Sequence, residues 1–350
     1  MDEALEASRA RASEVERPLA NEAVPLRVVA MGGGTGLPVV LRGLRSGGLL
    51  SRRGRALDVT AIVTMADDGG SSGRLRRDLG ILPPGDIRNC LVALAGGTGL
   101  SPLFQYRFRG RRELGGHTIG NLVLAALSAM HGDFLSAVQS CGRLLGSVGQ
   151  VLPSTLTPVT LVGERPDGSR ATGESRLGLG GGRLDRVWLE PADPPPTPGV
   201  LEAIENADLV VLGPGSLFTS ILPNLMVAGV RGALDRCRGR RVLVLNAMTQ
   251  PGETTGMTAA DHVRRVQEIA GRGCLDCVLV NTAPLPVRLL RRYRSEGSEP
   301  VRYRRNELLA LGVVPIETRL VGGRGRRARH DALKIGDVLH SLVGRAIGHA

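Results

Sequence analysis

The chain has very few aromatic residues, and this argues against one class of partner. Its 350 residues include one tryptophan, three tyrosines and four phenylalanines. Proteins that hold single-stranded nucleic acid stack the bases on aromatic side chains, and eight scattered aromatic residues make a poor stacking surface. No known nucleic-acid-binding motif is present either. We therefore expect no nucleic acid partner, despite a formal net charge of +12.

Paired cysteines and long apolar segments are also scarce. The five cysteines include one CxxC pair, Cys274 and Cys277, whereas a zinc site of this kind needs a second pair. No secretory segment is evident, which is typical of proteins in a reducing compartment. No run approaches the ~20 apolar residues of a membrane span. These absences predict a cytoplasmic protein with neither a zinc site nor a membrane span.

The positive charge comes almost entirely from arginine, because Lys334 is the only lysine. A guanidinium group binds phosphate through two parallel hydrogen bonds, so this composition favours an anionic ligand. A general bias toward arginine would give the same charge without a function. Glycine is abundant, with 49 residues, and its clustering at a few places predicts tight backbone loops rather than disorder.

Short apolar runs alternate with helical patterns along most of the chain. The expected strands are 26–31, 59–65, 157–162, 169–174, 187–190, 209–212, 242–246 and 277–280. The expected helices are 37–44, 87–95, 118–130, 134–145, 200–206, 225–237, 259–270 and 285–293. Continuous apolar strands are typical of a parallel sheet that is covered on both faces.

The sequence therefore predicts an α/β, Rossmann-like fold with a mostly parallel sheet and helices on both faces. The turn Arg165-Pro-Asp-Gly168 between two strand patterns predicts a small β-hairpin insertion. Residues 1–24 mix acidic, basic and alanine residues without an apolar stretch, so we expect a disordered tail. Residues 25–350 then form a single domain.

A glycine-rich loop follows the first expected strand and precedes a helix. It comprises Gly32, Gly33, Gly34, Thr35 and Gly36. Backbone N–H groups at the start of a helix bind phosphate, and glycine lets a phosphate approach the main chain. The third glycine of the dinucleotide-binding motif is missing, since leucine follows Gly36. The loop is thus either a phosphate contact or only a tight turn.

Two adjacent carboxylates end the second strand. Asp67 and Asp68 lie where open α/β sheets bind ligands, next to Ser71 and Ser72. They could coordinate Mg²⁺ or accept hydrogen bonds from a hydroxyl-rich ligand. The alternative is a loop whose carboxylates cap a helix.

Other candidate ligand-binding residues stand at strand ends or helix starts. These are Arg88, Asn89, His117, Asn121, Gly213, Gly215, Ser216, Asn246 and Thr249. Asn121 lies one helical turn beyond His117, so both share a face, and His117 fits a site and a structural role equally. The sequence contains no G-x-S-x-G, complete Walker A or HExxH motif, which argues against hydrolase, P-loop and zincin functions. Without a recognisable nucleophile–base pair, catalysis stays an open question.

Together these segments resemble the YvcK family of gluconeogenesis factors, a branch of the CofD-like superfamily. The resemblance covers about residues 26–340 and rests on segments 32–36, 66–74, 84–89, 116–121, 213–224, 248–250, 259–262 and 329–331. It implies a bacterial cytoplasmic protein that binds UDP-sugars such as UDP-N-acetylglucosamine and supports growth and cell shape on gluconeogenic carbon sources. It also implies that Tyr293 and Arg329 hold the nucleotide sugar, with Arg326 or Arg327 able to share the work of Arg329. We further expect a homo-oligomer and protein partners in cell-wall metabolism.

The CofD branch offers an alternative of another class. Its members resemble this chain at the glycine loop and at Asp67 and Asp68. They transfer a phospholactyl-type group from a nucleotide diphosphate to a deazaflavin with Mg²⁺, which the two aspartates would hold. The segment 219–224, together with Tyr293 and Arg329, favours the YvcK branch, for which no cofactor beyond the UDP-sugar ligand is certain.

Overall fold

The computed structural model describes residues 24–46, 56–97, 99–110, 114–177, 184–322 and 327–343. The expected tail therefore lies outside the described residues, apart from Val24, and so does Arg326. All five cysteines are buried free thiols.

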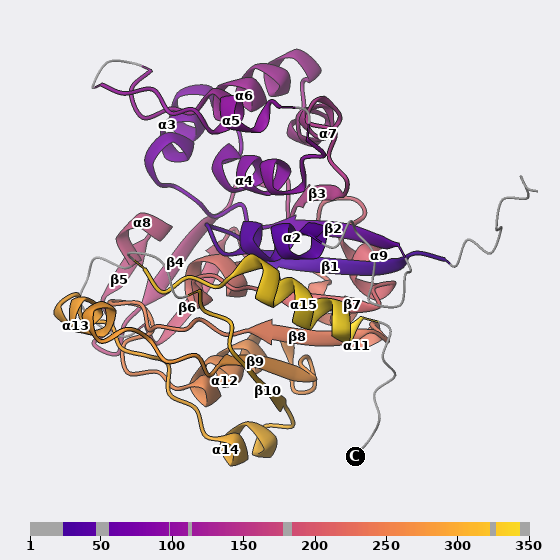
Figure 1. Cartoon of the computed structure of the whole chain (residues 1–350). Coiled ribbons are helices and arrows are strands. Elements are labelled where there is room, and N and C mark those ends of the chain that lie inside the picture. The colour runs from indigo at the N-terminus through magenta and orange to yellow at the C-terminus, as the bar shows by residue number, and fades with distance from the viewer. Residues whose placement is uncertain are drawn as a thin grey trace, which may run out of the picture.

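A seven-stranded parallel sheet forms the centre of the molecule, in the order β10-β9-β8-β7-β1-β2-β3 (Figure 1). Its strands are β1 (Leu26–Gly32), β2 (Leu57–Val63), β3 (Gln150–Pro153), β7 (Leu209–Leu212), β8 (Arg240–Val244), β9 (Cys277–Asn281) and β10 (Val314–Thr318). Successive strands are added from β1 toward β3 at one side of the sheet, and from β7 toward β10 at the other side. This reversal leaves a crevice at the carboxyl ends of β1 and β7, where open sheets bind ligands.

Helices cover the sheet, as the sequence predicts. They are α2 (Leu37–Ser46), α3 (Gly70–Leu79), α4 (Pro84–Leu94), α5 (Ser101–Gln105), α6 (Ile119–His131), α7 (Phe134–Leu144), α9 (Val200–Glu205), α10 (Leu222–Leu225), α11 (Val230–Arg236), α12 (Ala259–Ala270), α13 (Val287–Ser295), α14 (Arg305–Ala310) and α15 (Ala332–Leu342), with a π-helix at Leu217–Ile221. Figure 1 shows α2 and α15 side by side in front of the sheet. Their backbones meet at glycines, since a Cβ atom on Gly43 would lie 2.3 Å from the carbonyl oxygen of Ala332.

The expected hairpin insertion is a small antiparallel sheet of three strands. These are β4 (Thr160–Glu164), β5 (Arg170–Thr172) and β6 (Arg186–Glu190), in the order β5-β4-β6. The strand expected at 169–174 ends early, because the short helix α8 (Glu174–Leu177) begins two residues after β5. This insertion matters for the site described below.

Several elements differ from the sequence-based expectation. The helix expected at 225–237 begins only at Val230, as α11, because Gly229 adopts a φ of +79° just before it, and Leu225 is instead the last residue of α10. The expectation missed α3, which contains two glycines and two serines with weak helix propensity. It also missed β3, β10, α14 and α15, although Asp331 caps the start of α15 by accepting from the N–H groups of Leu333 and Lys334.

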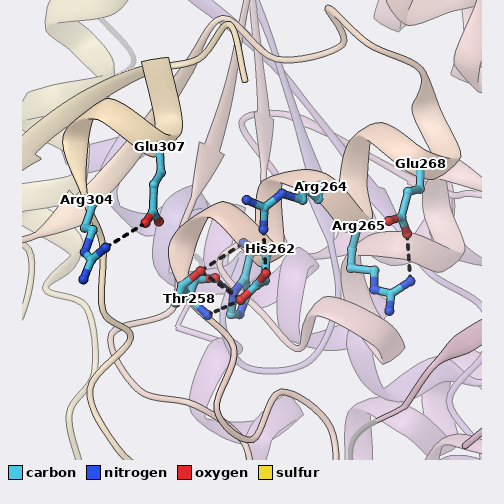
Figure 2. Close-up of polar contacts among 8 residues, drawn as sticks. Thr258, His262, Arg264, Arg265, Glu268, Arg304 and Glu307 are labelled. Atoms are coloured by element: carbon cyan, nitrogen blue, oxygen red, sulfur yellow. Dashed lines mark hydrogen bonds and ion pairs between the residues drawn. The ribbon is translucent and has the colours of Figure 1, made fainter. Parts of the chain in front are cut away.

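Segment 259–262 of the family resemblance has a structural role. Thr258 and Asp261 form a capping box at the start of α12, with each side chain accepting a hydrogen bond from the other's backbone N–H (Figure 2). The buried His262 ring contacts the carbonyl oxygen of Thr258 at 2.8 Å. Arg264 and Arg265 make ion pairs within the same helix (Figure 2). We therefore assign these residues to the stability of α12 rather than to a ligand site.

Among the described ranges, no single helix has the length and apolar composition to cross a membrane. The segments Leu217–Leu225 and Val230–Arg236 pass that test only when they are counted together, across a bend of 75°. Most of the apolar side chains in this bent pair are buried inside the protein.

Candidate functional site

A cavity of about 520 Å³ opens where the sheet order reverses, and its size is typical of small-molecule sites. Ten of the predicted site residues line it: Gly33, Gly34, Thr35, Gly36, Gly215, Ser216, Asn246, Thr249, Tyr293 and Arg329. They come from the segments that follow β1, β7, β8 and β9 and from the segment before α15. The remaining predicted residues lie elsewhere, as described below.

The glycine loops after β1 and β7 pack directly on one another. A Cβ atom on Gly36 would lie 1.9 Å from the carbonyl oxygen of Pro214, so only glycine permits this approach. Gly32 and Gly213, at the start of the two loops, also lie close together, since a Cβ atom on Gly32 would be 3.8 Å from the Cα atom of Gly213. The side-chain amide of Asn224 donates to the carbonyl of Gly32 at 3.1 Å. The two loops therefore form one continuous part of the cavity lining.

Asp86, in the first turn of α4, lies beneath the first glycine loop. Its carboxylate accepts a hydrogen bond of 2.5 Å from the N–H of Gly34. Burial, together with the negative charge of Asp67, raises the pKa of Asp86 to about 6. Because Asp86 already occupies the Gly34 amide, that amide is not free for a phosphate. The sequence analysis did not single out Asp86, which lies within the segment 84–89 of the family resemblance.

Asp67 and Asp68 point in different directions. The Asp67 carboxylate accepts from the N–H of Gly69 at 2.9 Å and from the side chain of Ser72, and burial raises its pKa. The Asp68 carboxylate instead accepts from the N–H of Ser175 in the first turn of α8, at 2.9 Å. Neither residue lines the cavity. Asp68 therefore caps a helix, although one that lies far away in the sequence.

The pair does not fit the Mg²⁺ site that the transferase alternative requires. The carboxylates of Asp67 and Asp68 engage different backbone groups and do not converge. Within the part of the chain that the structure describes, no three His, Cys, Asp or Glu side chains are arranged to hold a metal ion. We accordingly derive no step through a metal.

Ser71, Arg88, Asn89, His117 and Asn121 form a separate buried network between α3, α4 and α6. Ser71 lies 2.8 Å from His117 Nδ1 and accepts from the Asn121 amide at 2.9 Å. Arg88 donates to Asn121 at 3.1 Å and to Asn89 at 2.6 Å. Burial lowers the pKa of Arg88 to about 10. This network joins three helices and lies apart from the cavity lining.

Tyr293 and Arg329 both line the cavity. The hydroxyl of Tyr293 on α13 accepts a 3.0 Å hydrogen bond from the N–H of Ala328. Arg327 and Arg329 on either side of Ala328 also line the cavity. The pKa of Arg42 on α2 is lowered by burial and by the charges of Arg45 and Arg329. Positive charge therefore gathers at this part of the cavity lining.

Three acidic residues that the sequence analysis missed line the cavity, and one of them, Glu296, pairs with Arg292 of α13. Glu253 accepts a hydrogen bond from the side chain of Ser216, and burial raises its pKa. Glu174, from the inserted sheet, bonds to the side chain of Thr219, and burial raises its pKa to about 8. No sequence motif marks Glu174, because only the folding of the insertion over the sheet brings it here.

The fold and the cavity define an open α/β protein with a candidate ligand site at its topological switch point. Residues 28–321 match the family model described as 2-phospho-L-lactate transferase CofD, so the chain belongs to the CofD family. It is 43% identical to the gluconeogenesis factor of Bacillus subtilis over 318 residues, which span 91% of this chain and 98% of that protein.

A second relative and a solved structure agree with this assignment. The gluconeogenesis factor of Halalkalibacterium halodurans is 44% identical over 313 residues, covering 89% of this chain and 95% of that protein. A crystal structure of a Bacillus halodurans protein superposes with a TM-score of 0.85 at 43% identity, covering 90% of this chain and 99% of that one. These relatives place the chain in the gluconeogenesis-factor (YvcK) branch of the family.

Proposed function

We propose that this protein is a cytoplasmic gluconeogenesis factor that binds a UDP-sugar, with UDP-N-acetylglucosamine as the first candidate. It acts as a regulator of growth and cell shape under gluconeogenic conditions rather than as an enzyme. The relatives named gluconeogenesis factor support the general role. The ligand follows from the family resemblance and from the chemistry of the cavity.

The observation that carries the proposal is the wall formed by Tyr293, Ala328 and Arg329. Tyr293 offers an aromatic ring for a base, and its hydroxyl is already anchored to the backbone of Ala328. Arg329 offers forked donors and a permanent positive charge, which suit a diphosphate. An anchored aromatic ring next to a cationic side chain is a suitable arrangement for a nucleoside diphosphate.

The rest of the cavity suits the other end of such a ligand. Ser216, Asn246 and Thr249 add hydroxyl and amide groups at the strand ends. Asn246 also donates to the carbonyl of Gly215 at 2.7 Å, which fixes the second glycine loop. The cavity thus pairs a cationic wall with neutral polar and acidic groups, as a sugar nucleotide requires.

The second candidate is a CofD-type transferase that moves a phospholactyl-type group to a deazaflavin. The match of residues 28–321 to the model of that name favours it. The divergent carboxylates of Asp67 and Asp68 argue against a metal-dependent transfer at the predicted place. The two candidate functions require different ligands, so a measurement of ligand binding distinguishes them.

Titration calorimetry with UDP-N-acetylglucosamine, GDP and NAD tests the proposal. We expect the UDP-sugar to bind at least tenfold more tightly than GDP or NAD, because the proposed site recognises both the uridine and the sugar. Tighter binding of GDP would favour the transferase. Binding of none of the three would overturn the proposal.

A further inference from the structure

Among the described residues of the insertion, Glu174 at the start of α8 lines the cavity. Figure 1 shows α8, where Glu174 begins the helix, at the same end of the central sheet as α13, which carries Tyr293. The Glu174 carboxyl lines the cavity and bonds to the side chain of Thr219. An acidic side chain from the insertion therefore lines the cavity in which we place a phosphorylated ligand.

A clamp made by Asp68 fixes the backbone on both sides of Glu174. One carboxylate oxygen of Asp68 accepts from the N–H of Ser175 at 2.9 Å. The other lies so close to Gly173 that a Cβ atom there would be 1.9 Å away. Gly173 also has a φ of +93° and donates its N–H to the carbonyl of Leu161 in β4 at 2.8 Å. Asp68 thus determines the direction in which the Glu174 side chain leaves the backbone.

The charged residues of the cavity lining are the arginines Arg327 and Arg329 and the acidic residues Glu174, Glu253 and Glu296, of which Glu296 pairs with Arg292. The charges that act most strongly on Glu174 are those of Asp67, Asp86 and Glu253. The charge of Arg329 acts instead on Arg42 of α2. A diphosphate is attracted to the arginines and repelled by those carboxyl groups that are ionised. The hydroxyl groups of a sugar, by contrast, are good partners for a carboxyl group.

We infer that Glu174 contacts the hydroxyl groups of the bound sugar, and that Asp68 is the residue that positions Glu174 for this contact. This inference rests on the proposed function and sets the direction of the ligand within the cavity. The nucleoside diphosphate lies at the wall of Tyr293 and Arg329, and the sugar lies toward α8. The adjacent aspartates then have separate roles, since Asp67 accepts a hydrogen bond within its own loop, from Gly69, and Asp68 accepts one from Ser175 of the insertion.

The test compares a ligand that has the sugar with one that lacks it. The full chain and its variants are titrated with UDP-N-acetylglucosamine and with UDP. Glu174→Ala is expected to weaken binding of the UDP-sugar on the order of tenfold, the effect of one lost hydrogen bond, and to leave UDP within about twofold. Glu164→Ala is the matched control, because Glu164 lies on the same inserted sheet but pairs with Arg170. It should change neither affinity.

The positioning role predicts a non-additive result. Asp68→Ala should cause the same selective loss as Glu174→Ala, and the double variant should bind no more weakly than Glu174→Ala alone. Gly173→Ala disturbs the same clamp from the other side, and it replaces Asp68→Ala if that variant fails to fold. Thermal melting of each variant confirms that it is folded.

Three outcomes would overturn the inference while the proposed function stands. Glu174→Ala could weaken UDP and the UDP-sugar equally, which would mean that the residue does not distinguish the sugar. Glu174→Ala could change neither affinity. The losses from Asp68 and Glu174 could add in the double variant, which would mean that Asp68 acts independently. A parent protein that binds neither ligand would instead overturn the proposed function, and this inference with it.

Discussion

Asp86 makes the stability of the protein depend on pH, and its replacement by asparagine isolates the effect. Its pKa is raised from 3.8 to about 6, mainly by burial under the glycine loop. Between these pH values the folded state holds a proton that the unfolded state has released. Raising the pH through this range therefore destabilises the fold, by up to about 3 kcal/mol when the shift is converted at 1.36 kcal/mol per unit.

Asp86→Asn removes this titration but keeps an oxygen that can accept from the N–H of Gly34. The free energy of unfolding, measured in urea from pH 4 to pH 7.5, should fall less with rising pH in the variant than in the parent. Relative to the parent, the variant should gain up to about 3 kcal/mol between pH 4 and pH 7.5. Asp58→Asn serves as the control, because Asp58 is exposed on β2.

The difference in the free energy of unfolding between parent and variant is informative, because the contributions of the other titrating groups cancel in it. A difference that stays constant from pH 4 to pH 7.5 would show that Asp86 does not titrate in this range. A difference that shrinks with rising pH would mean that the Asp86 charge is stabilised in the fold. Either result would refute the environment that we assign to Asp86 beneath Gly34.

Three further predictions follow from the site and the sheet. Gly36→Ala should abolish UDP-sugar binding in calorimetry, because its Cβ atom would meet the Pro214 carbonyl. Gly34→Ala should instead lower the free energy of unfolding in urea by only ~1–2 kcal/mol, the cost of a left-handed non-glycine residue. Equal effects of the two variants, in binding and in unfolding alike, would contradict the packing of the two loops. Tyr293→Ala and Arg329→Ala should each lower UDP-N-acetylglucosamine affinity about ten- to hundredfold with the fold retained, and parent-like binding by both would refute the cationic wall. Arg241→Ala should lower the free energy of unfolding by about 3 kcal/mol, since it breaks a partly buried pair with Asp276. The affinity for the UDP-sugar should stay unchanged. A loss of affinity in this folded variant would show that the cavity depends on the amino end of the central strands.

The parallel sheet could be predicted from the sequence because its strands are continuous apolar runs. Leu209–Leu212 and Ala259–Ala270 were predicted with the bounds that the structure shows. Elements with weaker patterns were missed. Gly70–Leu79 is helical although glycine and serine disfavour helices, because tertiary packing overrides local propensity.

The candidate site was predictable where residues follow strand ends in sequence, as at Gly36 and Ser216. It was not predictable where long-range folding decides which way a side chain points. Asp67 and Asp68 are neighbours in sequence, yet their carboxylates serve different segments of the fold. Glu174 enters the cavity only because the inserted sheet folds over the main one.

A crystal structure of the protein with UDP-N-acetylglucosamine tests the central claim most directly. We predict that the ligand occupies the cavity at the carboxyl ends of β1 and β7, with the base at Tyr293 and the diphosphate at Arg329. Electron density for the ligand at any other place, with this cavity empty, would contradict the account.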